Sequence, residues 1–381
     1  MKSPSPEGLF CFRLPLPWLT PGASLFLHSS LIYDATPIRL GQLKGGSMKT
    51  ALIIGISGQD GTYLSKLLLD KGYRVVGTSR DAQMSNFRSL KKAGLFERIR
   101  LESMAIVDFR SVLQVLDVVG PDEIYNLAGQ SSVSLSFNQP VETFESISIG
   151  TLNLLEALRF LGSDARLYNA GSSECFGNTH GEPADESTPF RPRSPYGVAK
   201  AAAFWQVANY REAYRLFACS GILFNHESPL RPRRFVTQKI VDAACSIAHG
   251  TMDRLELGNI QIRRDWGWAP EYVQAMWLML QRDTPDDFVI ATGVTSRLED
   301  FVAQAFAAVG LDWHDYVRTD PALLRPTDIE IGRADPGKAA RELGWKAAYT
   351  MPDVVRMMVA ARREELRAES STGTGPRPAV S

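Results

Sequence analysis

Hydrophobic residues recur along this chain in two alternating patterns, short continuous runs and longer stretches with helical spacing. Residues 50–56 (TALIIGI) are a continuous apolar run, which is typical of a strand buried on both faces of a parallel sheet. Residues 59–71 follow with Leu64, Leu67 and Leu68 on one side, which predicts a helix. Strands that alternate with helices in this way predict an α/β fold built on a doubly wound parallel sheet. Further strands are predicted at 73–79, 123–129 and 165–171, and a further helical stretch at 140–161.

The pattern becomes irregular beyond Phe224, where arginine and proline are frequent. We therefore expect residues 48–224 to form the large sheet domain and residues 225–368 to form mainly a smaller C-terminal lobe. Helices are expected in this second part near 235–249, 268–281, 297–309 and 351–365.

The two ends of the chain differ from the part between them. Residues 1–47 mix prolines with short apolar bursts, and their longest apolar run is well below the ~20 residues that a membrane span needs. Arg13 and nearby prolines also interrupt the apolar region that a signal peptide would need. Because the composition changes abruptly at Met48, we expect the natural chain to start there, after a non-native or disordered extension. Residues 369–381 have the composition of a disordered tail.

Composition argues against several classes of partner. Lysine plus arginine and aspartate plus glutamate number 42 each among 381 residues, so no overall charge attracts nucleic acid or an anionic membrane. The four cysteines are scattered, with no CxxC pair and no metal-ligand spacing. The sequence therefore predicts a cytoplasmic protein without a metal centre, a nucleic-acid partner or a membrane partner.

A glycine-rich turn lies between the first predicted strand and the first predicted helix. Gly55, Gly58 and Gly61 in GISGQDG are spaced by three residues. Glycines at this place let the backbone turn tightly and approach a pyrophosphate, which is then held at the positive N-terminus of the helix. An ordinary strand-to-helix turn also holds glycines, but the position at the head of a βαβ unit favours dinucleotide binding.

The end of the second predicted strand, GTSRDAQ, bears on which dinucleotide is bound. Arg80 would pair with the 2′-phosphate of NADP, because the planar guanidinium suits a phosphate. Asp81 would instead bind a ribose hydroxyl, as in NAD enzymes. An exposed turn with a local ion pair is the structural alternative. We favour NADP over NAD.

A tyrosine and a lysine in SPYGVAK form a candidate catalytic pair. Tyr196 and Lys200 are four residues apart, so they share one face of a helix. A phenol with a pKa of about 10 is a poor base at neutral pH. The lysine ammonium and a bound nicotinamide cation would lower that pKa, so that Tyr196 takes a proton from a sugar hydroxyl as hydride leaves the same carbon. A structural pair on a helix surface is the alternative, but this pair lies about twenty residues beyond two serines at a strand end.

These features together resemble the extended short-chain dehydrogenase/reductases that act on nucleotide sugars. Longer blocks narrow the resemblance to the GDP-mannose 4,6-dehydratase family, and they cover nearly all of residues 48–365. The resemblance implies a Rossmann-type fold, bound NADP contacted by Tyr196 and Lys200, GDP-mannose as substrate, and a homodimer or homotetramer. The blocks include EIYNLAGQSSV, PRSPYGVAK, NYREAYRLFACSGILFNHESP, RRDWGWAPEYVQAMWLMLQ and RPTDIEIGRADPGKA.

The resemblance also gives a reason for the acid in YNAGSSECFGN, residues 168–178. Ser172 stands where the family usually has a threonine, and Glu174 matches the family glutamate. The implied reaction converts GDP-D-mannose to GDP-4-dehydro-6-deoxy-D-mannose and water. Tyr196 removes the O4 proton while hydride passes from C4 to NADP, and Ser172 hydrogen-bonds to O4. Glu174 then takes the acidified C5 proton and protonates the departing C6 hydroxyl, before hydride returns to C6.

Four residues in the second half match family positions that meet the substrate. Two arginines and a lysine among them suit a diphosphate through charge-assisted hydrogen bonds. A surface cation or salt-bridge partner is the alternative for each. The segment RPRRF (231–235) would similarly be a phosphate-binding loop or a solvated basic turn. The four substrate candidates are Asn225, Lys239, Arg264 and Arg325.

The sequence departs from the family at several positions. Ala105 stands where the family usually has an aspartate that touches adenine, and Ser132 replaces a histidine. The region after the second predicted strand lacks the family's paired arginines. These changes bear on cofactor preference, affinity and oligomeric state, whereas Glu174, Tyr196 and Lys200 are intact.

Two other functions share part of this pattern. The same glycines and Tyr–Lys pair would serve a GDP-4-keto-sugar reductase or a nucleotide-sugar epimerase, but neither would need Glu174 to remove a C5 proton. A non-catalytic nucleotide-binding sensor would tend to lose its catalytic groups before its glycines, whereas this chain keeps them. We therefore favour a lyase of the hydro-lyase class.

Overall fold

The fold is described from a computed structural model, which covers residues 48–371. The extension expected at 1–47 lies outside the described residues, as do residues 372–381. Helix α13 (Met351–Ser371) continues to Ser371, so residues 369–371 are helical and do not belong to the expected tail.

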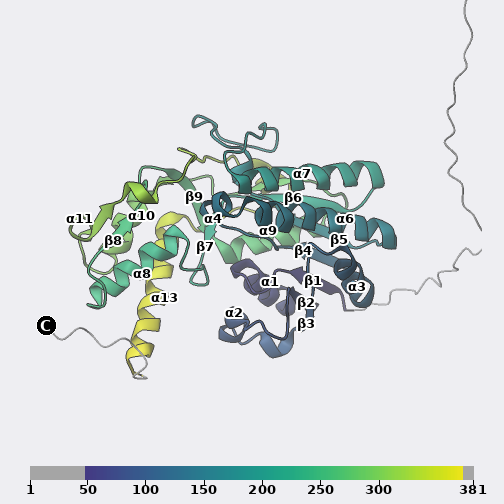
Figure 1. Cartoon of the computed structure of the whole chain (residues 1–381), viewed down its shortest axis with the longest axis horizontal. Helices are drawn as coiled ribbons and strands as arrows, with labels where there is room; N and C mark the ends of the chain where they lie inside the picture. The colour runs from purple at the N-terminus through teal and green to yellow at the C-terminus, as the bar shows by residue number, and fades with distance from the viewer. Residues whose placement is uncertain (1–47, 372–381) are drawn as a thin grey trace, which may run out of the picture. The chain divides into compact units, whose positions relative to one another are not determined.

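Seven parallel strands form the main sheet (Figure 1). In sheet order they are β10 (Phe288–Ile290), β6 (Ala218–Leu223), β5 (Arg166–Ala170), β4 (Glu123–Asn126), β1 (Thr50–Ile54), β2 (Arg74–Ser79) and β3 (Arg100–Ser103). The strand order reverses between β1 and β4, and such a switch point is where α/β sheets bind ligands at the carboxyl ends of their strands. Ile54 is in register with Thr78 of β2 and Asn126 of β4, so the loops after these strands open at one edge. The predicted doubly wound parallel sheet is confirmed.

Helices cover both faces of this sheet, which explains why β1 is apolar throughout. Ala51 and Ile53 of β1 pack into a core that contains apolar residues of two long helices and of two short ones, and Leu52 and Ile54 pack into a second core with three helices. No helix within residues 48–371 has both the length and the apolar character needed to cross a bilayer. The first face carries α1 (Gln59–Asp70) and α9 (Ala269–Gln281), and the second carries α3 (Phe109–Val119), α6 (Gly150–Leu161) and α7 (Pro195–Tyr214).

The helical stretch predicted at 140–161 is continuous but not uniform. Helix α5 (Pro140–Phe144) passes through a π-helical turn, Glu145–Ile149, before α6 begins. Within that turn, Ile147 packs against Tyr196 of α7 in a small apolar cluster. Single π-turns are frequent at functional sites because they redirect side chains locally. This one supports the tyrosine of the candidate catalytic pair.

The remaining strands form two small sheets around a further core. Strand β9 (Arg263–Trp268) lies between β11 (Thr295–Arg297) and β7 (Asn225–Glu227), and β8 (Leu255–Leu257) pairs with β12 (Val317–Thr319). Trp266 is buried in this core together with apolar residues of α8 (Val236–Ala248), α10 (Leu298–Ala307) and α13. Helices α8 and α10 begin and end close to the predicted bounds, whereas α13 begins at the predicted residue 351 and continues six residues beyond the predicted end at 365. The remaining α-helices of the described chain are short: α2 (Arg88–Lys92), α4 (Val133–Asn138), α11 (Trp313–Tyr316) and α12 (Gly337–Glu342). Three 3₁₀ turns accompany them: Phe96–Arg98, Ser173–Cys175 and Pro321–Leu323.

The chain returns to the main sheet after residue 224. Helix α9 packs on the sheet beside α1, and β10 pairs with β6. Asp287, just before β10, binds Arg211 of α7 through two contacts of 2.6 and 3.0 Å and accepts the Ser220 N–H at 2.6 Å. The expected boundary at residue 224 is therefore not a clean division, because later residues complete the first layer.

Candidate active site

The turn between β1 and α1 is shaped by its three glycines. Gly55 has a φ of +83°, and a Cβ there would lie 3.0 Å from the backbone of Leu127 and Ala128. A Cβ on Gly61 would lie 2.6 Å from the Ile56 backbone, so glycine lets α1 pack tightly against the turn. Gly58 is the N-cap of α1, and no side chain caps that helix end. This arrangement fits a dinucleotide, since helix N–H groups and the helix dipole favour a phosphate.

In the segment after β2, the Asp81 carboxylate is hydrogen-bonded to the backbone, whereas the Arg80 side chain is exposed. Asp81 Oδ1 accepts the backbone N–H groups of Gln83 at 2.9 Å and Met84 at 3.0 Å, so its carboxylate closes its own turn. The Arg80 side chain is 88% exposed, and its guanidinium lies 4.0 Å from Glu142. Arg80 does not line the cavity described below, and the exposed ion pair with Glu142 contributes little to stability.

Ser172, Glu174 and Tyr196 come together where β5 ends and α7 begins. Ser172 Oγ accepts the Glu174 N–H at 3.3 Å, and its hydroxyl is hydrogen-bonded to Tyr196. Ser194 caps α7 by accepting the Gly197 N–H at 3.0 Å. A Cβ on Gly197 would lie 2.8 Å from the Glu174 carbonyl oxygen, so the first turn of α7 lies directly against the Glu174 segment. Glycine at 197 thus brings the candidate acid and the candidate tyrosine into one site.

Lys200 lies one helical turn beyond Tyr196 and is buried. Its Nζ donates to the Ala170 carbonyl oxygen at 2.7 Å and lies 5.8 Å from the centroid of the Tyr196 ring. Burial lowers the pKa of Lys200 to about 8, with Cys175 and Asp60 opposing the fall. The end of β5 therefore fixes the lysine beside the tyrosine, as the four-residue spacing predicted.

Burial dominates the protonation of the two candidate proton carriers. It raises the pKa of Tyr196, against the hydrogen bond from Ser172 and the charge of Arg231. Among the protein's own groups, those that lower the pKa of Tyr196 are Ser172 and Arg231. The lowering that we expected from Lys200 together with a bound nicotinamide cation stays a prediction. Burial also raises the pKa of Glu174, against the positive charges of Arg264 and Arg325. A carboxyl with a raised pKa is suited to exchange protons near neutral pH.

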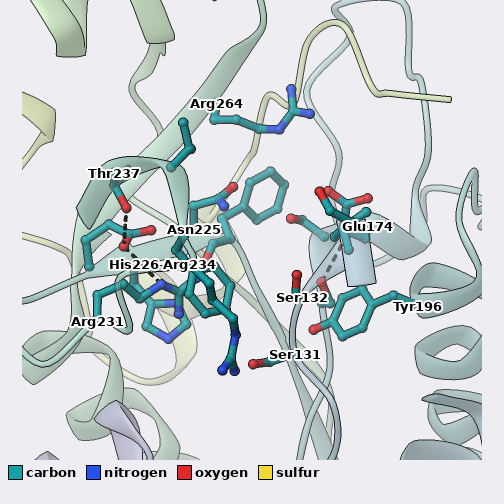
Figure 2. A pocket seen from close by; sticks show the side chains of 18 of the residues that line it. Ser131, Ser132, Glu174, Tyr196, Asn225, His226, Arg231, Arg234, Thr237 and Arg264 are labelled. Atoms are coloured by element: carbon teal, nitrogen blue, oxygen red, sulfur yellow. Dashed lines mark hydrogen bonds and ion pairs between the residues drawn. The ribbon is translucent and has the colours of Figure 1, made fainter. Parts of the chain in front are cut away.

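One cavity of about 400 Å³ gathers most of the predicted residues (Figure 2). Glu174 and Tyr196 lie together on one side, and Asn225, His226 and Arg231 lie across from them. The turn glycines do not line the cavity, although Gly55 lies against Leu127 and Ala128, which do. The predicted residues that line it are Ser172, Glu174, Tyr196, Lys200, Asn225, Lys239, Arg264 and Arg325.

The predicted substrate cations already have partners within the protein. Asp328 binds Arg264 at 2.9 Å and Arg325 at 3.3 Å, and Arg325 also donates to Ser134 at 3.0 Å. Lys239 Nζ donates to the Glu256 carbonyl oxygen at 2.6 Å. The two arginines are thus held by one carboxylate at the cavity wall, which fixes their direction before any anion binds.

Sequence reasoning missed several residues that line the cavity. Asp60 lies inside the glycine-rich turn GISGQDG, and His226 directly follows Asn225. Arg231 belongs to the basic segment 231–235, and its Nε lies 3.1 Å from the Glu227 carboxylate. The sequence does show a charged residue in the turn GISGQDG and a histidine in the segment FNHESP. It does not show that they contact each other, because they lie far apart in the chain. Ser131, Ser132, Arg234, Thr237 and Asp328 also line the cavity.

Comparison with known proteins identifies the family. A family model described as GDP-mannose 4,6 dehydratase matches residues 52–358. The chain belongs to that family. It is 45% identical to GDP-mannose 4,6 dehydratase 1 of Arabidopsis thaliana, over 84% of this chain and 93% of that protein. It is 41% identical to the GDP-mannose 4,6-dehydratase of Vibrio cholerae, over 84% of this chain and 95% of that protein.

Solved structures of other nucleotide-sugar enzymes share the fold. A dTDP-glucose 4,6-dehydratase of Streptomyces venezuelae, crystallised with NAD, has a TM-score of 0.75 at 22% identity and covers 84% of this chain and 98% of that chain. A UDP-glucose 4-epimerase of Thermus thermophilus, in complex with NAD, has a TM-score of 0.72 at 24% identity and covers 82% and 99%. These likenesses confirm the predicted Rossmann-type architecture.

Proposed function

We propose that this chain is a hydro-lyase that converts GDP-D-mannose to GDP-4-dehydro-6-deoxy-D-mannose and water. One observation carries the proposal. In a chain that belongs to the GDP-mannose 4,6-dehydratase family, Glu174, Tyr196 and Ser172 line one cavity, and Ser172 Oγ accepts the Glu174 N–H. Removing a C5 proton and expelling the C6 hydroxyl requires an acid–base group in addition to the one that acts at O4.

In this proposal the side chains divide the proton transfers between them. Tyr196 takes the proton from O4, and Ser172, hydrogen-bonded to Tyr196, donates to O4 as charge develops there. The carbonyl formed at C4 acidifies the C5 proton, which Glu174 removes. Glu174 then delivers that proton to the leaving C6 hydroxyl, so that water departs and a C5–C6 double bond conjugated to the C4 carbonyl remains. Hydride addition at C6 converts this to an enolate, which takes up a proton from solvent at C5; in deuterated water that proton is a deuteron. Lys200 is fixed on the Ala170 carbonyl oxygen one helical turn from Tyr196. We propose that it favours the phenolate together with the nicotinamide cation when the cofactor is bound, in addition to the effects of Ser172 and Arg231.

The reaction also needs a nicotinamide cofactor, which we propose to be NADP. Gly55, Gly58 and Gly61 would hold its diphosphate at the N-terminus of α1. The bound nicotinamide supplies a hydride acceptor for C4 and a hydride donor for C6. NADP is favoured over NAD because the Asp81 carboxylate is already hydrogen-bonded to the backbone of its own turn. The Arg80 guanidinium, in contrast, is exposed and could bind a 2′-phosphate.

The opposite wall of the cavity is proposed to bind the GDP-sugar. Arg264 and Arg325 are oriented by Asp328 and suit a diphosphate, with Lys239 nearby as a further cation. Asn225, the first residue of β7, would hydrogen-bond to the sugar or ribose.

We further propose a cytoplasmic homodimer or homotetramer. The support is the family resemblance together with apolar side chains exposed on two neighbouring helices. Phe144 of α5 is 39% exposed and Trp205 of α7 is 61% exposed. Sedimentation of the purified protein tests this, and a monomer at micromolar concentration would reject it.

A GDP-4-keto-sugar reductase or an epimerase is the competing function, and deuterium labelling separates the two. The protein is incubated with GDP-mannose in deuterated water, with NADP⁺ in one sample and NAD⁺ in another. We expect a product that has lost one water and gained one deuterium at C5, formed faster with NADP⁺. Mass spectrometry follows both changes.

The Glu174→Gln variant is the matched control for this experiment. It should bind the sugar nucleotide but form little product. Intact GDP-mannose with either cofactor would reject the dehydratase proposal and direct attention to 4-keto sugars as substrates. Equal rates with the two cofactors would reject the preference for NADP.

A further inference from the structure

A carboxylate and an imidazole face each other at the edge of the glycine turn. Asp60 is the second residue of α1, and its Oδ2 lies 2.9 Å from Nε2 of His226 in β7. The other ring nitrogen, Nδ1, lies 2.8 Å from the Phe224 carbonyl oxygen. Both ring nitrogens therefore meet acceptors, which a protonated imidazole satisfies with two N–H donors. The ring also stacks on Tyr272, with centroids 4.5 Å apart.

A second connection joins the same two segments. Gln59 donates to the His226 carbonyl oxygen at 3.2 Å and accepts from the Ser228 hydroxyl at 2.7 Å. Two consecutive residues of α1 thus bind the segment that carries Asn225. Because these contacts are buried or nearly so, they fix the glycine turn relative to β7.

Asp60 places a negative charge where the proposed cofactor carries its diphosphate, and the charge of its partner His226 opposes it. Asp60 lines the cavity at the N-terminus of α1, which is where the proposed function requires a diphosphate. An unpaired carboxylate there would repel that anion. His226 offers the compensating positive charge, and it lies on the cavity wall near Arg231 (Figure 2).

The other charged and titratable groups around the pair do not replace His226. Arg231, from the loop after β7, lies 3.1 Å from Glu227 and is already engaged there. Lys200 of α7 donates to the Ala170 carbonyl oxygen. Tyr272 of α9 stacks on the ring without an ionic contact. The direct ionic partner of Asp60 is therefore the imidazole.

We infer that the Asp60–His226 pair is a charge-compensating link, which joins the cofactor-binding turn to the β7 segment and cancels the Asp60 charge beside the cofactor diphosphate. The inference rests on the proposed cofactor site. His226 acts in this scheme as a positioning residue, because it works through Asp60. The link explains why a carboxylate is compatible with a turn built to receive an anion.

Four proteins freed of any co-purified cofactor test the inference: wild type, His226→Gln, Asp60→Asn and the double variant. NADP⁺ is titrated into each, and binding is followed by calorimetry. His226→Gln should weaken binding at least tenfold, because it leaves Asp60 as an uncompensated anion. The double variant should recover most of the loss, because it removes the anion as well. His314→Gln, which alters the exposed His314–Asp312 pair, is the matched control and should bind like wild type.

The double variant separates charge compensation from a purely structural role. If it binds NADP⁺ as weakly as His226→Gln, the inference is overturned while the proposed function stands. If wild type binds neither NADP⁺ nor NAD⁺, both are overturned. Should His226→Gln fail to fold, the His226 ring is titrated by NMR in wild type and Asp60→Asn. A lower pKa for the ring in Asp60→Asn supports the link, and an unchanged pKa overturns it.

Discussion

The pKa of the Glu174 carboxyl is set by burial and by three charged residues around it. Burial raises its pKa, Arg264 and Arg325 oppose the rise, and Asp328 adds to it. A general base must be deprotonated to act, so its pKa sets the acid limb of the activity profile. The cavity wall that is proposed to bind substrate therefore also tunes the base.

We expect wild-type kcat to fall as the pH drops through the raised pKa of Glu174, at a higher pH than for an ordinary glutamate. Asp328→Asn should move this acid limb to lower pH, because it removes a negative charge that raises the Glu174 pKa. Arg264→Gln should move the limb to higher pH for the opposite reason. Profiles of kcat at saturating GDP-mannose check both shifts, and limbs that coincide with wild type would contradict this origin of the pKa.

At this scale the sequence predicted eight residues that line one cavity. Ser172, Tyr196 and Lys200 were indicated by a strand end and by helix spacing, which constrain where side chains lie, whereas Glu174 and the four substrate candidates were assigned by the family resemblance. It did not predict that Asp60 meets His226, since 166 positions separate them and no local pattern encodes the pairing. The raised pKa of Tyr196 was also missed, because burial depends on packing that the four-residue spacing to Lys200 does not report.

At the scale of elements, the tight contact between α1 and its preceding turn depends on Gly61. We expect Gly61→Ala to lower the free energy of unfolding by roughly 1–3 kcal/mol, because the new methyl group would overlap the Ile56 backbone. Gly58→Ala is the control, since a Cβ there would meet its nearest atom, the Gly55 carbonyl oxygen, at an ordinary 3.5 Å. Urea unfolding of the cofactor-free proteins measures both. Equal losses would show that the packing of α1 does not depend on residue 61.

Most of the elements that were predicted begin and end close to their expected positions, because apolar runs and leucine spacing reflect burial on the sheet. The π-helical turn Glu145–Ile149 was not predicted. Its five residues interrupt a stretch whose amphipathic pattern is compatible with an ordinary helix. In the structure, Ile147 of this turn packs against Tyr196 of α7, a contact between distant residues that the local pattern does not encode.

At the scale of the whole molecule, the N-terminal part depends on residues beyond 224. Tyr272, Met276, Met279 and Leu280 of α9 are fully buried in the core beneath the sheet, and Phe288 of β10 joins them. Burying each such side chain contributes about 1.5–3 kcal/mol, so their joint loss is comparable to the whole stability of a typical domain, about 5–15 kcal/mol.

We therefore expect a fragment of residues 48–224 to lack a cooperative unfolding transition, whereas residues 48–371 should show one. Circular dichroism during thermal or urea unfolding makes the comparison. A sharp transition in the short fragment would show that the first half folds alone. The sequence predicted a boundary at 224 because the alternation of strands and helices becomes irregular there. This alternation does not show that a later strand, β10, pairs with β6 of the first half.

Because β10 follows its partner β6 by more than 60 residues, β6 is synthesised well before the strand that pairs with its outer edge. A growing chain releases β6 from the ribosome well before β10 has been made, so the outer edge of β6 presents unpaired N–H and C=O groups in the meantime. Such an edge is a template for pairing with a neighbouring nascent chain on the same messenger. We therefore expect a translational pause before residue 288 to prolong this exposure and to increase the fraction of the protein that aggregates.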